Sequence, residues 1–123
     1  MRHKSTTLTG QELEIMQIVW RRESATVRDV YEELLLQRKV AYTTVMTMMK
    51  ILEGKKYLKR TEVDRAYVYR PAQPQKQVVG AMVKDFLNRV FNGSAEPLLV
   101  HLVEDHHLSQ SDLEEIARLR RKP

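Results

Sequence analysis

Three threonines and a lysine lie at helical spacing near the middle of the chain. Thr43, Thr47 and Lys50 are three or four residues apart, so a helix would bring them onto one face, with Thr44 on its flank. A threonine hydroxyl can donate or accept a hydrogen bond, and its methyl group can contact the methyl group of thymine. A lysine ammonium can contact a phosphate. These residue types at this spacing predict a helix face that contacts base edges in the major groove of DNA.

Further basic side chains follow this helix in the sequence, where they could contact the phosphates of the DNA backbone. Lys55 and Lys56 follow the helix directly, and further basic residues lie in the next segment. Phosphate contacts supply affinity, whereas base contacts supply specificity. The residues that we predict to contact DNA are Tyr42, Thr43, Thr44, Thr47, Lys50, Lys55, Lys56, Lys59, Arg60 and Arg65.

The net charge of the chain is concentrated around these residues. The 123 residues carry a formal charge of +5. Residues 1–73 hold 14 basic and 9 acidic residues, residues 38–73 hold 9 and 3, and residues 74–123 hold 7 of each. Such asymmetry predicts one segment that meets a polyanion and another with a different role.

Two helices are expected before the threonine-rich one. Thr9 with Glu12, and Thr26 with Asp29, have the spacing of capping boxes. The first helix is expected to run to about Arg22. A third helix is expected over residues 43–53, with Gly54 as its C-cap because glycine adopts positive φ at little cost. Its expected inward stripe is Val45, Met48, Met49 and Leu52.

A β-hairpin is expected next. Residues 57–63 and 66–70 have strand composition, and Asp64-Arg65 would form the turn. Tyr67 and Tyr69 are assigned to packing of this hairpin, and Pro71 and Pro74 end it. Three helices followed by a hairpin is the order of a winged helix-turn-helix, in which the third helix enters the major groove. The fold is therefore expected to be mainly α with a small β-hairpin.

Helical segments with wide apolar stripes make up the rest of the chain. A long helix is expected from about Gln75, with a break at residues 92–94, a short helix, and a last helix capped by Ser109 and Asp112. About 50 residues rarely bury enough surface alone. We therefore expect a winged-helix DNA-binding domain at 1–73 and a helical dimerisation domain at 74–123. The expected dimerisation residues are Val79, Met82, Val83, Phe86, Val90, Phe91, Leu98, Leu99, Leu102, Val103, Leu113 and Ile116. The alternative is that these helices fold back onto the N-terminal domain.

Several other classes of function have little support in the sequence. The absence of cysteine excludes disulfides, thiolate metal sites and a cysteine nucleophile, and no phosphate loop or catalytic triad has supporting context, so an enzyme is not expected. No cofactor is expected. No apolar run is long enough to span a bilayer, and residues 1–10 lack the apolar stretch of a signal peptide, so a cytoplasmic protein is expected.

Two alternatives to a DNA-binding repressor remain open. The third helix could dock a protein partner, which would make the chain a protein-interaction module. The cluster of His101, Asp105, His106 and His107 could bind a metal, which would make it a metal-responsive regulator. The weak spacing of this cluster favours solvent-facing residues, and no metal site is predicted.

The ordered segments LTGQELEIMQIVW, TVRDVYEELL, AYTTVMTMMKILEGKKYLKR and RAYVYRP resemble the penicillinase-repressor (BlaI/MecI/CopY) family over nearly the whole chain. The resemblance implies a bacterial homodimeric transcriptional repressor that binds a pseudo-palindromic operator. It further implies control of β-lactamase or penicillin-binding-protein genes, or of copper-transport genes. In the β-lactam branch, a membrane sensor protease system signals and the repressor is cleaved in its dimerisation domain.

The sequence departs from the pattern of this family at two places. The copper branch binds metal through C-terminal cysteine pairs, and this chain has no cysteine, so copper sensing by that route is excluded. The β-lactam branch is cleaved at an Asn-Phe bond, whereas His101-Leu102 occupies the matching place here. The resemblance therefore leaves the inducing signal open.

Overall fold

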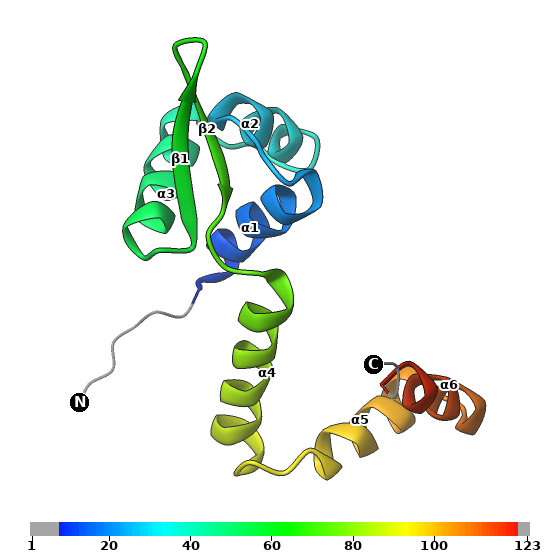
Figure 1. Ribbon diagram of the computed structural model, residues 1–123. Coiled ribbons are helices and arrows are strands. Elements are labelled where there is room, and N and C mark those ends of the chain that lie inside the picture. Colours follow the sequence, from blue (N-terminus) through cyan, green and yellow to red (C-terminus); the bar gives the residue numbers. More distant parts are fainter. Residues whose placement is uncertain (1–7, 121–123) are drawn as a thin grey trace. The chain divides into compact units, whose positions relative to one another are not determined.

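The computed structural model describes residues 8–120, which form six helices and one two-stranded hairpin (Figure 1). In chain order the elements are α1 (Gly10–Arg22), α2 (Val27–Leu35), α3 (Tyr42–Gly54), β1 (Leu58–Val63), β2 (Ala66–Pro71), α4 (Gln75–Phe91), α5 (Glu96–His106) and α6 (Gln110–Arg120). They divide into two compact units, one up to Val79 and one from Gly80 onward, so the division falls inside α4. The assignment of roles to residues 1–73 and 74–123 stays a prediction.

The first two helices begin at the predicted capping boxes. The Thr9 side chain accepts a hydrogen bond from the N–H of Glu12 at 3.1 Å, and the Glu12 carboxylate accepts one from the N–H of Thr9 at 2.9 Å. Thr26 and Asp29 make the same reciprocal pair at the start of α2. Each box satisfies two backbone N–H groups that the helix itself leaves unpaired.

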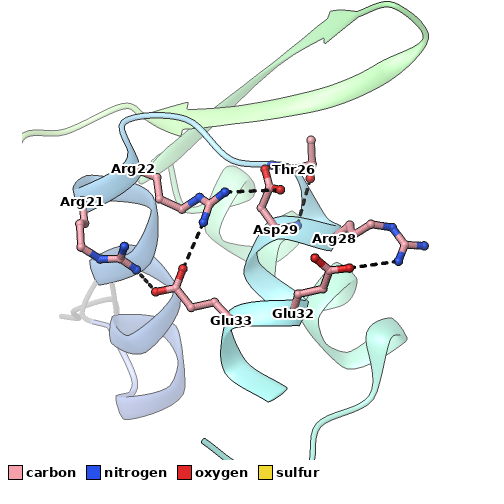
Figure 2. Close-up of polar contacts among 7 residues, drawn as sticks. All are labelled: Arg21, Arg22, Thr26, Arg28, Asp29, Glu32 and Glu33. Carbon is pink, nitrogen blue, oxygen red and sulfur yellow. Dashed lines mark hydrogen bonds and ion pairs between the residues drawn. The ribbon is translucent and has the colours of Figure 1, made fainter. Parts of the chain in front are cut away.

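Ion pairs join the end of α1 to α2 (Figure 2). Arg21 and Arg22, in the last turn of α1, both contact the carboxylate of Glu33, and Arg22 also lies 3.5 Å from Asp29. Arginines at the C-terminal end of a helix also interact favourably with its dipole. These contacts set the position of α2, against which α3 packs.

The end of α3 differs from the prediction. Gly54 was expected to act as the C-cap in a positive-φ conformation, but it is the last helical residue, and Lys56 adopts φ +71° instead. The N–H of Tyr57 donates to the carbonyl of Leu52 at 2.9 Å, and that of Lys56 donates to Glu53 at 3.0 Å, which is a Schellman motif. Leu52 and Tyr57 are both buried, so their burial determines which residue turns the chain.

The hairpin forms at the predicted place and has antiparallel register from Leu58↔Pro71 to Val63↔Ala66. Asp64 and Arg65 both have positive φ, at 51° and 68°, as a two-residue type I′ turn requires. In a further pairing that was not predicted, Ala25 and Tyr69 exchange backbone hydrogen bonds of 2.9 and 2.8 Å. The link between α1 and α2 thereby extends the hairpin.

The first unit has a closed apolar core. Each of its three helices and its hairpin contributes side chains that are at most 2% exposed, among them Ile15, Met16, Val19, Val30, Leu34, Val45, Met49, Leu52, Leu58 and Tyr69. The expected inward stripe of α3 is confirmed for three residues, whereas Met48 is only half-buried. Trp20 is also half-buried, and its indole N–H donates to the carbonyl of Gln73 at 3.0 Å.

The second unit contains no buried side chain among residues 80–119. Its helices α4, α5 and α6 form where the sequence predicted them, and Ser109 and Asp112 cap α6 reciprocally at 2.9 and 3.0 Å. Many of its apolar side chains are nevertheless exposed. This unit is thus well formed locally but has no enclosed core of its own.

Candidate nucleic-acid interface

Helix α3 has one fully buried face and one exposed face. Val45, Met49 and Leu52 are each 0% exposed. The predicted base-reading residues Thr43, Thr44 and Thr47 are all exposed, and so is Lys50, which is predicted to contact phosphate. The helix is therefore held by its apolar side, and its hydroxyl and ammonium groups are available to a partner.

The beginning of α3 differs from those of α1 and α2. Its N-cap residue is Ala41, no side chain caps the helix, and its first turn contains no acidic residue. The positive end of the helix dipole is therefore not neutralised by a carboxylate, and such an end attracts phosphate. Tyr42 packs edge-on against Tyr31, with 5.3 Å between ring centroids, which fixes this end of the helix.

The hairpin carries exposed cations along its length. The Arg60 guanidinium lies 4.1 Å from the centroid of the Tyr67 ring and 3.5 Å from the Glu53 carboxylate. Arg65 is exposed in the turn, and Lys59 is exposed opposite Arg70. Like charges at directly opposed positions repel each other. An anion bound beside this pair would relieve the repulsion.

Tyr69 anchors the hairpin to the core. Its side chain is 2% exposed. Burial raises the pKa of the Tyr69 hydroxyl above its ordinary value, although the neighbouring Arg60 guanidinium opposes the shift. Tyr69 therefore stays neutral at physiological pH and acts in packing, as predicted, whereas Tyr67 is 51% exposed and packs against Arg60.

Lys55 does not extend outward as a phosphate contact would. Its ammonium lies 2.9 and 3.1 Å from the two carboxylate oxygens of Glu12, which is 5% exposed. Burial by itself raises the pKa of Glu12, but hydrogen bonds from Thr9 and the Lys55 ammonium outweigh it, so the pKa lies below its usual value. In this structure Lys55 joins the end of α3 to the start of α1.

Two basic residues adjoin the predicted contact set but were not included in it. Arg28 lies in the first turn of α2, with its guanidinium 6.0 Å from the Tyr42 ring centroid. Arg70 joins Lys59 through strand pairing. The place of Arg28 depends on a contact between two helices, which the sequence does not reveal. The place of Arg70 follows from the hairpin register, which could have been used to include it in the prediction.

The predicted dimerisation residues are all exposed or half-buried. Among the exposed ones, Val83 is 46% exposed, Val90 and Ile116 are each 53% exposed, and Leu99 is 47% exposed. Phe86 is 40% exposed and packs edge-on against Phe91, with 5.9 Å between ring centroids. The apolar stripes of α4, α5 and α6 are thus not covered by other described residues of their own unit.

The C-terminal histidines are spread along exposed positions within residues 8–120. The Nδ1 atom of His101 lies 3.2 Å from an Asp105 oxygen, and both side chains are exposed. Over residues 8–120, no three histidine, aspartate or glutamate side chains come close enough together to hold an ion. The His101-Leu102 bond lies within α5, and none of the helices described is long and apolar enough to cross a membrane.

Comparison with known proteins identifies relatives over the whole length. The family model described as penicillinase repressor matches residues 8–122. The chain is 26% identical over 122 residues to the methicillin resistance regulatory protein MecI of Mammaliicoccus sciuri, with 99% of both chains covered. It is 36% identical over 111 residues to the transcriptional regulator BlaI of Mycobacterium tuberculosis, with 89% of this chain and 80% of that protein covered.

A solved structure matches the first unit and includes DNA. The monomeric form of Bacillus licheniformis BlaI in complex with the blaP half-operator superposes with a TM-score of 0.51 at 27% identity. The match covers 57% of this chain and 85% of that one. It confirms the winged-helix fold expected for the N-terminal part.

Proposed function

This chain belongs to the penicillinase repressor family, a family of DNA-binding transcriptional repressors and not of enzymes, and we propose that it acts as a homodimer on a pseudo-palindromic operator. One observation carries the proposal. The outward face of α3 is composed of Thr43, Thr47 and Lys50, while its opposite face is buried in the core. The site of action is then the cytoplasm, where the DNA is.

Each element has a distinct part in binding. Helix α3 enters the major groove, where Thr43, Thr44 and Thr47 contact base edges. Its uncapped N-terminus and Lys50 face the phosphates. The hairpin lies along the backbone and contributes Arg60 and Arg65. We assign Lys55 to bracing, because its ammonium is paired with Glu12.

The second unit supplies the dimer contact. Its uncovered apolar side chains lie on α4, α5 and α6, and a second copy of the same surface would bury them. A two-fold axis through this contact would present two α3 helices to two half-sites, one helical turn or a multiple of it apart. Dimerisation therefore also doubles the number of base contacts.

The genes controlled are proposed from the relatives. One relative is named a methicillin resistance regulatory protein and another a penicillinase repressor, from Bacillus licheniformis. We therefore propose β-lactamase or penicillin-binding-protein genes as targets and a membrane sensor protease system as the source of the signal. Cleavage at His101-Leu102 would require α5 to unwind first, because a protease binds its substrate extended and this bond is helical.

Affinity for DNA from the chain's own promoter, measured by fluorescence anisotropy over a salt series, tests the proposal. Specific binding should exceed binding to random DNA by at least ~10³-fold, and log affinity should fall with log salt by ~0.9 per phosphate neutralised. Equal affinity for random DNA, or a flat salt response, would refute sequence-specific binding and favour the protein-interaction alternative.

Two variants test the division of roles. Thr47→Val keeps the shape of the side chain but removes its hydroxyl, so affinity for the operator should fall while affinity for random DNA stays the same. Arg65→Ala should weaken binding to both DNAs and lower the salt slope by ~0.9. Arg89→Ala, which removes an exposed arginine from α4, is the matched control and should change neither. If Thr47→Val and Arg65→Ala act alike, the assignment is wrong.

A further inference from the structure

A cavity of about 510 Å³ lies between the first turn of α2, the exposed side of α3 and the hairpin. This volume lies within the range of about 300–1,000 Å³ that small-molecule sites occupy. Its lining includes the small side chains of Thr26 and Ala66. Its walls come from segments up to 43 residues apart in the chain, so only the folded unit forms it.

Among the described residues 8–120, three cations and no carboxylate line the cavity. Arg28 and Arg60 each have a carboxylate partner outside the lining, Glu32 and Glu53, at 3.5 Å in both cases. Lys50 makes no ion pair with any residue in the described range 8–120. Within this described range its ammonium has no paired carboxylate, so the cavity favours an anion.

The remaining walls are aromatic and apolar. Tyr42 and Tyr67 are 39% and 51% exposed, so their rings offer area for stacking, while Tyr69 is buried behind them. Met46, whose flexible thioether adapts to different shapes, lies on the α3 side. Such walls recognise two features of a ligand together. One is a ring that can stack on tyrosine, and the other is a carboxylate that can pair with an ammonium.

We propose that this cavity binds an aromatic carboxylate, with the ring between Tyr42 and Tyr67 and the carboxylate at Lys50 and Arg28. The consequence for regulation rests on the proposed function. Tyr42, Lys50 and Arg60 belong to the predicted DNA contact set, so an occupied cavity neutralises cations that the phosphates need. The ligand and the operator then compete, and the ligand lowers the affinity for DNA.

The binding step is tested on the full chain without DNA. Titration with 2-naphthoate, followed by amide NMR shifts, should saturate with a Kd of about 1 mM or tighter, as expected for a ligand of this size. The shifts should centre on the start of α2, on α3 and on β2. 2-Naphthamide, which has the ring but no charge, and acetate, which has the charge but no ring, should bind at least about tenfold more weakly. No saturation, equal binding of 2-naphthamide, or shifts centred elsewhere would overturn the proposal.

Variants locate the charge that holds the ligand. Lys50→Gln should weaken 2-naphthoate binding by about fivefold, whereas Lys84→Gln, an exposed helical lysine of the second unit, should leave it unchanged. Glu32→Gln removes the carboxylate beside Arg28 and should tighten binding by about twofold. If Lys50→Gln retains the affinity of the unaltered chain while its amide spectrum shows an intact fold, the carboxylate is not held at this position.

The regulatory step is measured separately, as operator affinity at rising 2-naphthoate concentration. At ten times its Kd, competition should weaken operator binding by about tenfold, and 2-naphthamide at the same concentration should not. Unchanged operator affinity at a saturated cavity would overturn the competition. Failure of the ligand-free chain to bind its operator would instead refute the proposed function, while the titration without DNA would still decide whether the cavity binds the ligand.

Discussion

The two units of this chain use the same apolar helical patterns with opposite outcomes. On α3, Val45, Met49 and Leu52 are 0% exposed, whereas on α4, Phe86 is 40% and Val90 53% exposed. The stripe on α3 is covered by α1, α2 and the hairpin. The stripe on α4 has no such cover within its own unit. An amphipathic stripe therefore predicts that a partner exists but does not say whether that partner belongs to the same chain.

The units also differ in what their polar residues do. In the first unit, Lys55, Arg22 and Trp20 connect different elements, and a buried carboxylate is paired. Among residues 80–119 of the second unit, side-chain hydrogen bonds join residues three or four positions apart, as in Arg89 with Asp85. The first unit is consequently stabilised by long-range contacts and the second by local ones. The first should unfold independently of concentration, and the second should depend on dimer formation.

The largest effect is expected for Leu52→Ala. Removing a fully buried leucine side chain costs ~2–5 kcal/mol of unfolding free energy, because a cavity remains where the core cannot collapse. Urea denaturation followed by Trp20 fluorescence measures it. The loss should be the same at about 1 µM and about 100 µM protein, concentrations chosen to favour the monomer and the dimer respectively. A loss that grows with dilution would mean that the first unit also depends on dimerisation.

Phe86→Ala should weaken the dimer and leave the first unit stable. If a second copy covers the exposed 40% of Phe86 on both protomers, losing that burial twice costs roughly 1–2.5 kcal/mol per dimer, which raises the dimer Kd by roughly 5- to 70-fold. Sedimentation equilibrium measures the Kd, and Lys84→Ala on the same helix is the control. An unchanged Kd would show that the exposed stripe of α4 is not the dimer contact.

Glu12→Gln tests the long-range polar bracing of the first unit. It should cost ~1–3 kcal/mol at pH 7, since Lys55 loses its charged partner. The pKa of Glu12 is lowered in the folded state, so its contribution is full above the ordinary value of 4.5 and is lost as pH falls through the folded pKa. The difference between the two proteins should therefore vanish in acid. A difference that persists at pH 2 would mean that the effect is packing rather than charge.

Local signals in the sequence were sufficient for most of the secondary structure. The capping boxes at Thr9, Thr26 and Ser109 each need only two residues three positions apart, and all three formed. The buried and exposed faces of α3 followed from helical periodicity alone. These features depend on neighbours in the chain, which is why they could be predicted.

Features that depend on distant residues could not be predicted. Lys55 was assigned to DNA because nothing in its surroundings indicated Glu12, which is 43 positions away. The bridge from Ala25 to Tyr69 and the cavity beside Arg28 likewise exist only in the fold. The shift of the positive φ from Gly54 to Lys56 arises from the burial of Tyr57, which outweighs the preference of glycine for that conformation.

The smallest effect is expected from removing a helix-capping hydroxyl, which can be done at an equivalent position in each unit. Thr26→Ala and Ser109→Ala each remove one capping hydroxyl, which is worth ~1 kcal/mol. In the first unit, α2 is part of a cooperative core, so Thr26→Ala should lower the global unfolding free energy by that amount. In the second unit, Ser109→Ala should instead speed amide hydrogen exchange within α6 by about fivefold and leave the denaturation midpoint of the first unit unchanged. Equal effects of the two substitutions on global unfolding would show that the two units unfold together as one cooperative unit. That result would contradict the proposed difference between them.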